Sequence, residues 1–279
     1  MTLKHILVHV DDSRRFDSRL NVALRMAADH EAQVTGLYIV AQPYLPTYMA
    51  GYVGDGFYEN QRQLARDAAE KARLTFAERV DSAGLSQDWI VADGPPAGRI
   101  SEIARYADLV VIGQPDLDEV GAGDPARDLP GSVILESGRP VLVVPYAGTF
   151  DHVGSTVMVM WNASREAARA VYDALPILKA ARKVVVTSIN PGRGGPDIGD
   201  LPGADIAHQL ARHGVTVETS PTHADDIDVD DVILSRAADM SADLIVMGGY
   251  GRSRVRELIL GGATRGILDH MTMPVMFSH

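Results

Sequence analysis

The heptapeptide ADLVVIG at residues 107–113 recurs, with two conservative changes, as ADLIVMG at residues 242–248. Each copy is a short aliphatic run that ends in glycine. A run this short and this apolar is typical of a strand buried on both faces of a parallel sheet. Its recurrence within a chain of 279 residues indicates an internal repeat, and an internal repeat determines the architecture of the whole molecule.

Two further matches extend the repeat in both directions. ILVHVDDS at residues 6–13 resembles VMVMWNAS at 157–164, and PVLVV at 140–144 resembles PVMF at 274–277. The matches keep their order along the chain, and each half is long enough to bury its own core. We therefore predict two tandem domains, the first copy (residues 1–148) and the second copy (residues 153–279), with the boundary near residues 148–154.

Apolar runs alternate with segments of helical periodicity in both copies. This alternation predicts an α/β fold of two doubly wound, Rossmann-like domains, each a five-stranded, mostly parallel sheet with helices on both faces. Ligands of such sheets bind beyond the carboxyl ends of the strands, at the switch point of the topology. Strands are expected at residues 5–10, 34–40, 88–92, 108–113 and 140–145, and near 155–161, 183–189, 215–219, 243–248 and 274–278. Helices are expected at 14–29, 59–83, 97–107 and about 126–137, and near 164–180, 203–213, 229–240 and 262–271.

A glycine-rich segment, GGYGRS at residues 248–253, directly follows one of these strands, and a second glycine pair stands at 261–262. Glycines let a backbone approach a ligand closely. Free backbone N–H groups followed by a helix N-terminus make an anion site. Arg252, Ser253 and Thr264 could add polar contacts. The alternative is a tight turn that needs glycine for its shape alone. The lysine of a P-loop is missing.

The spacing Gly248-x2-Gly251-x9-Gly261 resembles the Gly-x2-Gly-x9-Gly-Ser/Thr signature of the universal stress protein family. The segments ILVHVD at 6–11 and GPPA at 94–97 resemble that family too. The resemblance implies an adenine nucleotide alpha hydrolase-like fold and an ATP-binding branch, in which the glycine amides and the Ser/Thr hold phosphates and ribose. It also implies that the residue ending the first strand lies near adenine and ribose. The expected site for ATP or another adenine nucleotide comprises Asn162, Ile189, Gly248, Gly251, Arg252, Ser253, Gly261, Gly262 and Thr264.

The second copy departs from the family pattern at two points. Gly262 stands where the family has Ser or Thr, so one hydroxyl is lost, and Thr264 two residues later is a possible substitute. Asn162 replaces the acid that ends the first strand, which keeps a hydrogen-bonding group but removes the charge.

The first copy departs in the opposite way. It keeps the acid, Asp11, but Asp116 stands in place of the second glycine, where its charge would repel a phosphate. Counting back from the proline of the last strand puts Arg127 at the position of the late glycine, which places Gly131 and Ser132 inside or at the start of the next helix. We therefore expect the first copy to bind no phosphate.

Composition narrows the function further. The net charge is −11, which argues against nucleic acid as a partner. The chain has no cysteine, no metal-ligand spacing among its nine histidines and no nucleophile motif, so we expect no metal and no catalytic residues, with slow ATP hydrolysis left open. The N-terminal apolar run reaches Asp11 and Asp12 too soon for a signal peptide, and no run approaches membrane-spanning length. We expect a cytoplasmic location.

Two function classes remain. The first is a stress-response regulator that binds ATP in its second copy, and the second is an interaction module that acts through protein partners. The Tyr-rich loop at 43–58 is either a lid or partner surface, or an insertion packed on its own domain. The acidic residues between 225 and 231 favour the start of a helix rather than a cation site. The resemblance to the family implies that the last strands pair antiparallel, as they do across a dimer of single copies. Here the strands at 140–145 and 274–278 can pair within one chain, which protects both edges; a further homodimer is left open.

Overall fold

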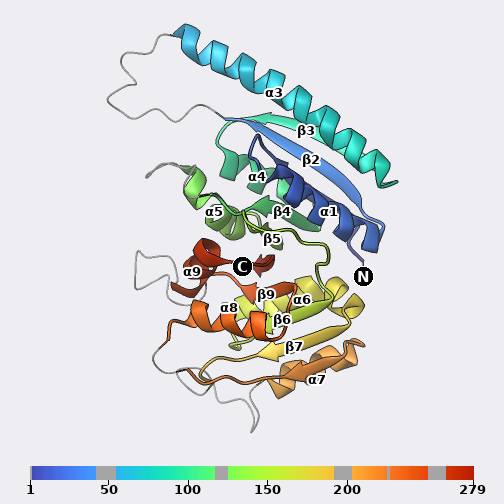
Figure 1. Ribbon diagram of the computed structural model, residues 1–279, viewed down its shortest axis with the longest axis vertical. Helices are drawn as coiled ribbons and strands as arrows, with labels where there is room; N and C mark the ends of the chain where they lie inside the picture. The colour runs from blue at the N-terminus through green and yellow to red at the C-terminus, as the bar shows by residue number, and fades with distance from the viewer. Residues whose placement is uncertain (1, 42–54, 117–124, 192–202, 225–226, 251–261) are drawn as a thin grey trace.

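The computed structural model describes residues 2–41, 55–116, 125–191, 203–224, 227–250 and 262–279 (Figure 1). Within these ranges the strands of both copies join into one continuous sheet, and helices cover both of its faces.

The secondary structure follows the predicted pattern closely. The first copy contains β1 (His5–Val10), α1 (Phe16–His30), β2 (Gln33–Val40), α3 (Asp55–Ser82), β3 (Gln87–Asp93), α4 (Pro96–Ala104), β4 (Leu109–Gly113), the 3₁₀ helix η1 (Pro125–Asp128), α5 (Leu129–Glu136) and β5 (Val141–Val144). The second copy contains β6 (Thr156–Met160), α6 (Arg165–Ala180), β7 (Lys183–Thr187), α7 (Ala204–Arg212), β8 (Val217–Thr219), α8 (Val229–Asp239), β9 (Leu244–Gly248), α9 (Gly262–His270) and β10 (Val275–Ser278).

The strand order is β3-β2-β1-β4-β5-β10-β9-β6-β7-β8. Neighbouring strands within each copy are parallel, and the direction of winding reverses between β1 and β4 and between β6 and β9. The copies meet at β5 and β10, which pair antiparallel with Val143 opposite Val275 and Val141 opposite Phe277. The predicted fold class and the pairing of the two last strands within one chain are confirmed.

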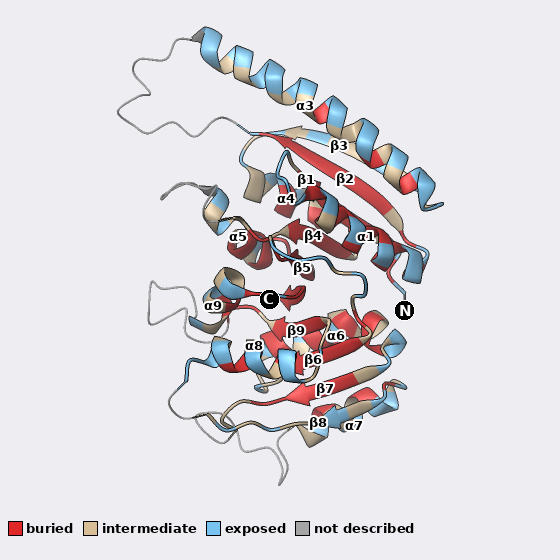
Figure 2. Ribbon diagram, in the orientation of Figure 1, coloured by how far each residue is buried: buried red, intermediate tan, exposed pale blue. Residues whose placement is uncertain are grey.

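The sheet is buried on both faces, as the continuous aliphatic runs predicted (Figure 2). On one face its side chains pack with α1, α3, α6 and α7, and on the other with α4, α5, α8 and α9. The seam between the copies contributes to both layers, because Met276 of β10 packs on the first face and Phe277 on the second. The hydrophobic core therefore runs through the seam without interruption.

The repeated Ala-Asp pair before β4 and β9 has a structural role. The Asp108 carboxylate accepts hydrogen bonds from the backbone N–H groups of Lys4 and His5, at 2.8 and 3.1 Å. In the second copy the Asp243 carboxylate accepts from three successive backbone N–H groups at the start of β6, at 2.9 to 3.1 Å. Each aspartate thus links the start of the fourth strand of its copy to the start of the first by hydrogen bonds. This shared role explains why the Ala-Asp pair recurs.

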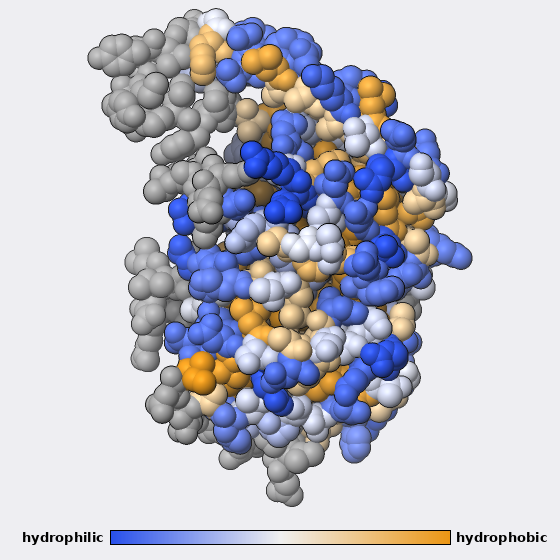
Figure 3. All heavy atoms as spheres, in the orientation of Figure 1, coloured by the Kyte–Doolittle hydropathy of each residue, from blue (hydrophilic) through white to orange (hydrophobic). Residues whose placement is uncertain are grey.

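Helix α3 corrects one boundary. It begins at Asp55, so Phe57 and Tyr58, which we assigned to the Tyr-rich loop, lie in its first turns. Residues 43–54 of that loop lie outside the described residues. The helix buries only a narrow strip against β2 and β3, and it leaves Leu64 and Leu74 more than half exposed. Figure 3 shows hydrophobic residues interspersed among hydrophilic ones along α3.

The acidic segment before α8 lies where a helix dipole favours it. Asp228 precedes the helix, and Asp230 and Asp231 fall in its first turn. This agrees with the prediction for these three residues; Asp225 and Asp226 lie outside the described ranges. None of the helices in the described part of the chain is both long and apolar enough to cross a membrane.

Candidate functional site

The carboxyl ends of β6 and β9 define the predicted crevice of the second copy. Asn162 follows β6, and its side-chain oxygen accepts the backbone N–H of Ser164 at 3.1 Å. Ser164 in turn caps α6 by accepting the N–H of Ala167 at 3.1 Å. Ile189 follows β7 and forms a parallel bridge with Thr222. Asn162 and Ile189 thus both lie at the carboxyl edge of the sheet, as a ligand crevice requires.

Gly248, the last residue of β9, has a packing role that spacing alone did not reveal. A Cβ atom added to it would lie 2.6 Å from the backbone N of Ala167 and the backbone C of Glu166. The first turn of α6 therefore rests directly on this glycine. This contact is by itself a sufficient reason for glycine at position 248.

The segment after β9 turns back toward α9. Tyr250 has a positive φ of 50° and is only 3% exposed. Its backbone N–H donates to Oγ1 of Thr264 at 3.2 Å. Thr264, expected as a substitute phosphate ligand, is itself buried, and its oxygen holds this turn.

Gly262 is the first residue of α9, and its backbone is open to solvent. It is exposed, and a Cβ atom added to it would meet nothing within 4 Å. The remaining predicted ligands, Gly251, Arg252, Ser253 and Gly261, lie outside the described residues. Tyr250 and Gly262 are thus the described flanks of the candidate phosphate loop.

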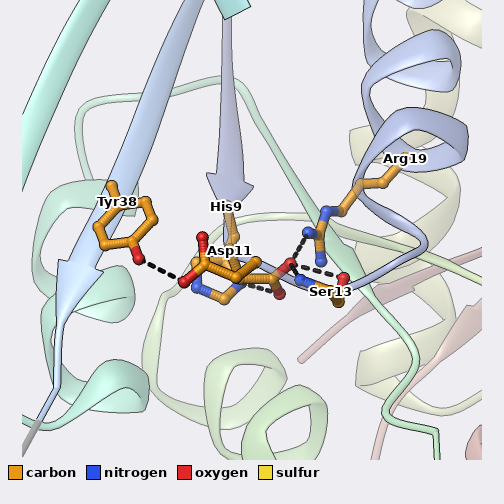
Figure 4. Close-up of polar contacts among 6 residues, drawn as sticks. His9, Asp11, Ser13, Arg19 and Tyr38 are labelled. Carbon is orange, nitrogen blue, oxygen red and sulfur yellow. Dashed lines mark hydrogen bonds and ion pairs between the residues drawn. The ribbon is translucent and has the colours of Figure 1, made fainter. Parts of the chain in front are cut away.

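The corresponding crevice of the first copy holds an ion pair (Figure 4). Arg19 reaches across from α1, and its Nη2 donates to Oδ1 of Asp11 at 2.6 Å. Arg19 is buried, at 4% exposure, and its guanidinium lies against the end of β4, since a Cβ atom on Gly113 would come within 2.6 Å of Nη1. The side chain therefore spans the carboxyl ends of β1 and β4, which is the switch point of the first copy.

Further polar groups surround this pair. Ser13 Oγ donates to Oδ1 of Asp11 at 2.6 Å, and the Tyr38 hydroxyl donates to Asp12 at 2.8 Å. His9 Nδ1 lies 3.7 Å from Oδ2 of Asp11, and among the described residues it has no hydrogen-bond partner. Burial alone would raise the pKa of Asp11, but the charges of Arg19 and His9 and the hydrogen bonds from Arg19 and Ser13 outweigh it and hold that pKa well below its usual range.

Arg19 was missed in the sequence. The offset that relates Asp11 to Asn162 relates Arg19 to Ala170, which is buried in α6. The signal that could have found it is an arginine within the apolar stripe of a helix, between Phe16 and Ala23. Asp11 is the acid that ends the first strand of the first copy, and its carboxylate already forms an ion pair with Arg19 of the same copy.

His9 makes the stability of the protein depend on pH. Burial lowers its pKa from 6.5 to about 4, so the unfolded chain binds the proton first as the pH falls through that interval. We expect the free energy of unfolding to drop by about 1 kcal/mol between pH 7 and 5.5 through this group. Urea unfolding at both pH values measures the drop in the wild type and in His9→Gln. An equal drop in the two proteins would contradict the assignment. The pKa of His30 is also lowered, and its contribution is common to both.

The described residues contain no group of three or more carboxylate and histidine side chains placed to hold a metal. In the first copy, η1 occupies the place of the late loop glycine, and Gly131 and Ser132 lie within α5. The placement of Gly131 and Ser132 in a helix is confirmed.

The fold and the two crevices place the chain among tandem doubly wound α/β proteins. The chain belongs to the universal stress protein family, whose model matches residues 2–145 and again residues 155–279. A universal stress protein of Mycolicibacterium smegmatis (strain ATCC 700084 / mc(2)155) is 24% identical over 290 residues, which cover 97% of this chain and 95% of the relative. Membership supports a role in the stress response.

One solved structure that covers nearly the whole chain has the same fold. The crystal structure of a universal stress protein from Archaeoglobus fulgidus DSM 4304 matches with a TM-score of 0.78 at 17% identity, over 99% of this chain and 96% of that one. A universal stress protein solved in complex with cAMP matches 52% of this chain and 98% of its own length, with a TM-score of 0.40 and 20% identity.

Proposed function

We propose that the protein is a stress-response regulator that binds an adenine nucleotide, ATP in the first instance, in its second copy. The observation that carries the proposal is the exposed Gly262 at the start of α9, a helix that Thr264 joins by a hydrogen bond to Tyr250, two residues after β9. Backbone N–H groups at a helix N-terminus attract anions, and a Cβ atom added to Gly262 would meet nothing within 4 Å. The nucleotide would shift a conformation or a partner affinity, and we propose no catalysis.

The proposed ligands divide by the part of the nucleotide they face. The amides of Gly251 and Gly261, with Arg252 and Ser253, would hold the phosphates. Asn162 and Ile189, at the carboxyl ends of β6 and β7, would face ribose and adenine. These roles rest on the resemblance of the loop to the family signature and on the parallel pairing of β6 and β7, which brings their carboxyl ends to the same side of the sheet.

One nucleotide per chain follows from the difference between the copies. In the first copy the Asp11 carboxylate is engaged by Arg19, Asp116 brings negative charge to the place of the second loop glycine, and η1 occupies the place of the late one. We propose that this copy takes no phosphate. A further homodimer of the chain and its cytoplasmic location stay predictions.

Restoring the lost hydroxyl tests the site. We expect Gly262→Ser to tighten ATP binding about threefold to tenfold, as one added hydrogen bond to a phosphate would. The site has room for it, because nothing lies within 4 Å of the new Cβ atom. Isothermal titration calorimetry measures the dissociation constant and the number of sites, which we expect to be one per chain.

Two further variants serve as controls for that experiment. Gly262→Ala adds the same Cβ atom without the hydroxyl and should leave affinity unchanged. Gly251→Asp gives the second copy the residue that the first copy has at Asp116, and it should abolish binding. Absence of saturable heat from the wild type at millimolar ATP would defeat the proposal. Steady phosphate release above a heat-killed control would show that the protein is a hydrolase.

The alternative is an interaction module that binds no nucleotide. The observation in its favour is that Gly248 is explained by its contact with α6, without any ligand. Leu64 and Leu74 on α3 add exposed apolar contact area for a partner. Under this alternative Gly251→Asp leaves partner binding and the cellular phenotype unchanged.

A further inference from the structure

The seam between the two copies follows a local two-fold axis. In the antiparallel pairing of β5 with β10, Leu142 stands opposite Met276. These residues are equivalent, since each is the second residue after the proline that precedes its strand, Pro140 or Pro274. Helices α5 and α9 precede the same two strands and lie face to face across the seam (Figure 1). A space between these two helices therefore brings equivalent positions of the two copies together.

A cavity of about 280 Å³ lies between α5 and α9. Three pairs of equivalent residues line it, with one member from each copy: Pro115 and Tyr250, Gly131 and Arg265, and Leu135 and Asp269. The two members differ in every pair, because the first copy is small or apolar where the second copy is aromatic or charged. In a dimer of identical chains both walls would carry the same residues. The tandem chain thus has a cavity that presents different chemistry on its two sides.

The wall formed by α9 carries one positive and one negative group. Arg265 and Asp269 are one helical turn apart, and Nε of Arg265 lies 3.6 Å from Oδ2 of Asp269. Their side chains keep 52% and 38% of their exposure, so a ligand can reach both charges. A molecule with one carboxylate and one ammonium group can engage both at once, through charge-assisted hydrogen bonds to the guanidinium and to the carboxylate.

The cavity also has an apolar part. Pro130 and Leu135 of α5 contribute to it from the first copy, and Leu268 of α9 contributes from the second. An aliphatic group that packs there leaves water, which favours binding. The cavity therefore suits a ligand in which an aliphatic chain is attached to a pair of opposite charges.

The remaining charged groups of the lining limit the net charge of the ligand. Arg127, Asp128 and Glu136 bring the lining to two guanidinium groups and three carboxylates. This near balance disfavours a polyphosphate and favours a ligand without net charge. The volume is at the small end for ligand pockets, which suits a molecule the size of an amino acid.

Contacts across the seam hold the two walls in place. The side-chain amide of Gln114, which follows β4, donates to the carbonyl oxygens of Leu268 and Asp269 at 2.8 and 3.2 Å. Tyr250 approaches α5 so closely that a Cβ atom added to Gly131 would fall far inside van der Waals contact with its hydroxyl oxygen. A cavity with fixed walls pays little ordering cost when a ligand enters.

We propose that this cavity binds a small zwitterion, an α-amino acid with an aliphatic side chain. Its carboxylate binds Arg265, its ammonium group binds Asp269, and its side chain packs on Leu135 and Leu268. None of the residues that line the cavity is among the proposed nucleotide ligands. The inference therefore stands or falls independently of nucleotide binding.

Binding of L-leucine to the full chain, measured by isothermal titration calorimetry, tests the proposal. Two analogues share its aliphatic chain, since 4-methylpentanoate lacks the ammonium group and isopentylamine lacks the carboxylate. We expect L-leucine to bind saturably at one site per chain. Each analogue should bind at least about tenfold more weakly, because one charge-assisted hydrogen bond is lost.

Two variants assign the charged groups. Arg265→Gln should weaken L-leucine and 4-methylpentanoate about tenfold and leave isopentylamine no weaker. Asp269→Asn should weaken L-leucine and isopentylamine about tenfold and leave 4-methylpentanoate no weaker. Arg169→Gln is the matched control, because Arg169 pairs with Asp173 at the same helical spacing on α6, outside the cavity. It should leave all three affinities unchanged.

The crossed pattern distinguishes this cavity from a site elsewhere on the protein. Absence of saturable binding of L-leucine to the wild type would overturn the inference. Binding that neither Arg265→Gln nor Asp269→Asn weakens would overturn it too, as would variants that weaken all three compounds equally. Thermal unfolding of each variant shows that it is folded.

Discussion

Replacing Arg19 with methionine is expected to lower the free energy of unfolding by about 3 kcal/mol, because it leaves the Asp11 carboxylate without its partner. Methionine keeps much of the apolar length of the side chain, so the loss reports mainly on charge. Asp11 retains a third of its side-chain exposure, which places the estimate at the lower end for broken buried pairs. Denaturant unfolding at pH 7 measures the change.

Two comparisons isolate the ion pair. Arg25→Met on the same helix breaks an exposed pair with Asp151 at 3.7 Å and should cost less than about 0.5 kcal/mol. Asp11→Asn combined with Arg19→Met should recover part of the loss, because no unpaired charge remains. If Arg19→Met is no more destabilising than Arg25→Met, the guanidinium does not hold the crevice together.

Gly248→Ala is expected to destabilise the protein by about 3 kcal/mol, since overpacking against rigid backbone forces a helix to move. The new Cβ atom would lie 2.6 Å from the backbone of α6, at Glu166 and Ala167. Thermal and denaturant unfolding both measure the effect.

The first copy supplies the matched control. Gly113 has the corresponding place at the end of β4, but a Cβ atom there meets the far end of the Arg19 side chain, which can move. Gly113→Ala should therefore cost only about 1 kcal/mol. Equal losses at Gly113 and Gly248 would mean that α6 does not rest on β9 as described.

The strands and the repeat of this fold could be predicted from short stretches of the sequence. Short aliphatic runs predicted the strands, because a strand covered on both faces has no polar positions. The recurrence of Asp108 as Asp243 predicted the repeat, and the structure gives its reason in the backbone N–H groups that each carboxylate binds. The pairing of β5 with β10 was expected from the resemblance to the family, in which the last strands pair across a dimer, and it protects both edges.

The candidate site was less predictable, because its decisive contacts join residues far apart in the chain. Spacing singled out Gly248 as a phosphate glycine, but its nearest neighbours belong to α6. Arg19 belongs to no motif, and only the fold brings it over Gly113. The approach of Tyr250 to Gly131 joins the two copies, and no pattern within either copy encodes it. Helix α3 began earlier than predicted because a polar, exposed helix has little apolar periodicity to mark its start.

The seam between β5 and β10 also changes what a mutation can do. In an assembly of two identical chains every substitution is made twice, so neither half can specialise alone. Here each half is encoded separately, and the first copy has Asp11 and Arg19 where the second copy has Asn162 and Ala170. The pairing of β5 with β10 also does not depend on protein concentration, because both strands belong to one chain and meet at a fixed effective concentration. A substitution in the crevice of one half therefore leaves the crevice of the other half unchanged in sequence.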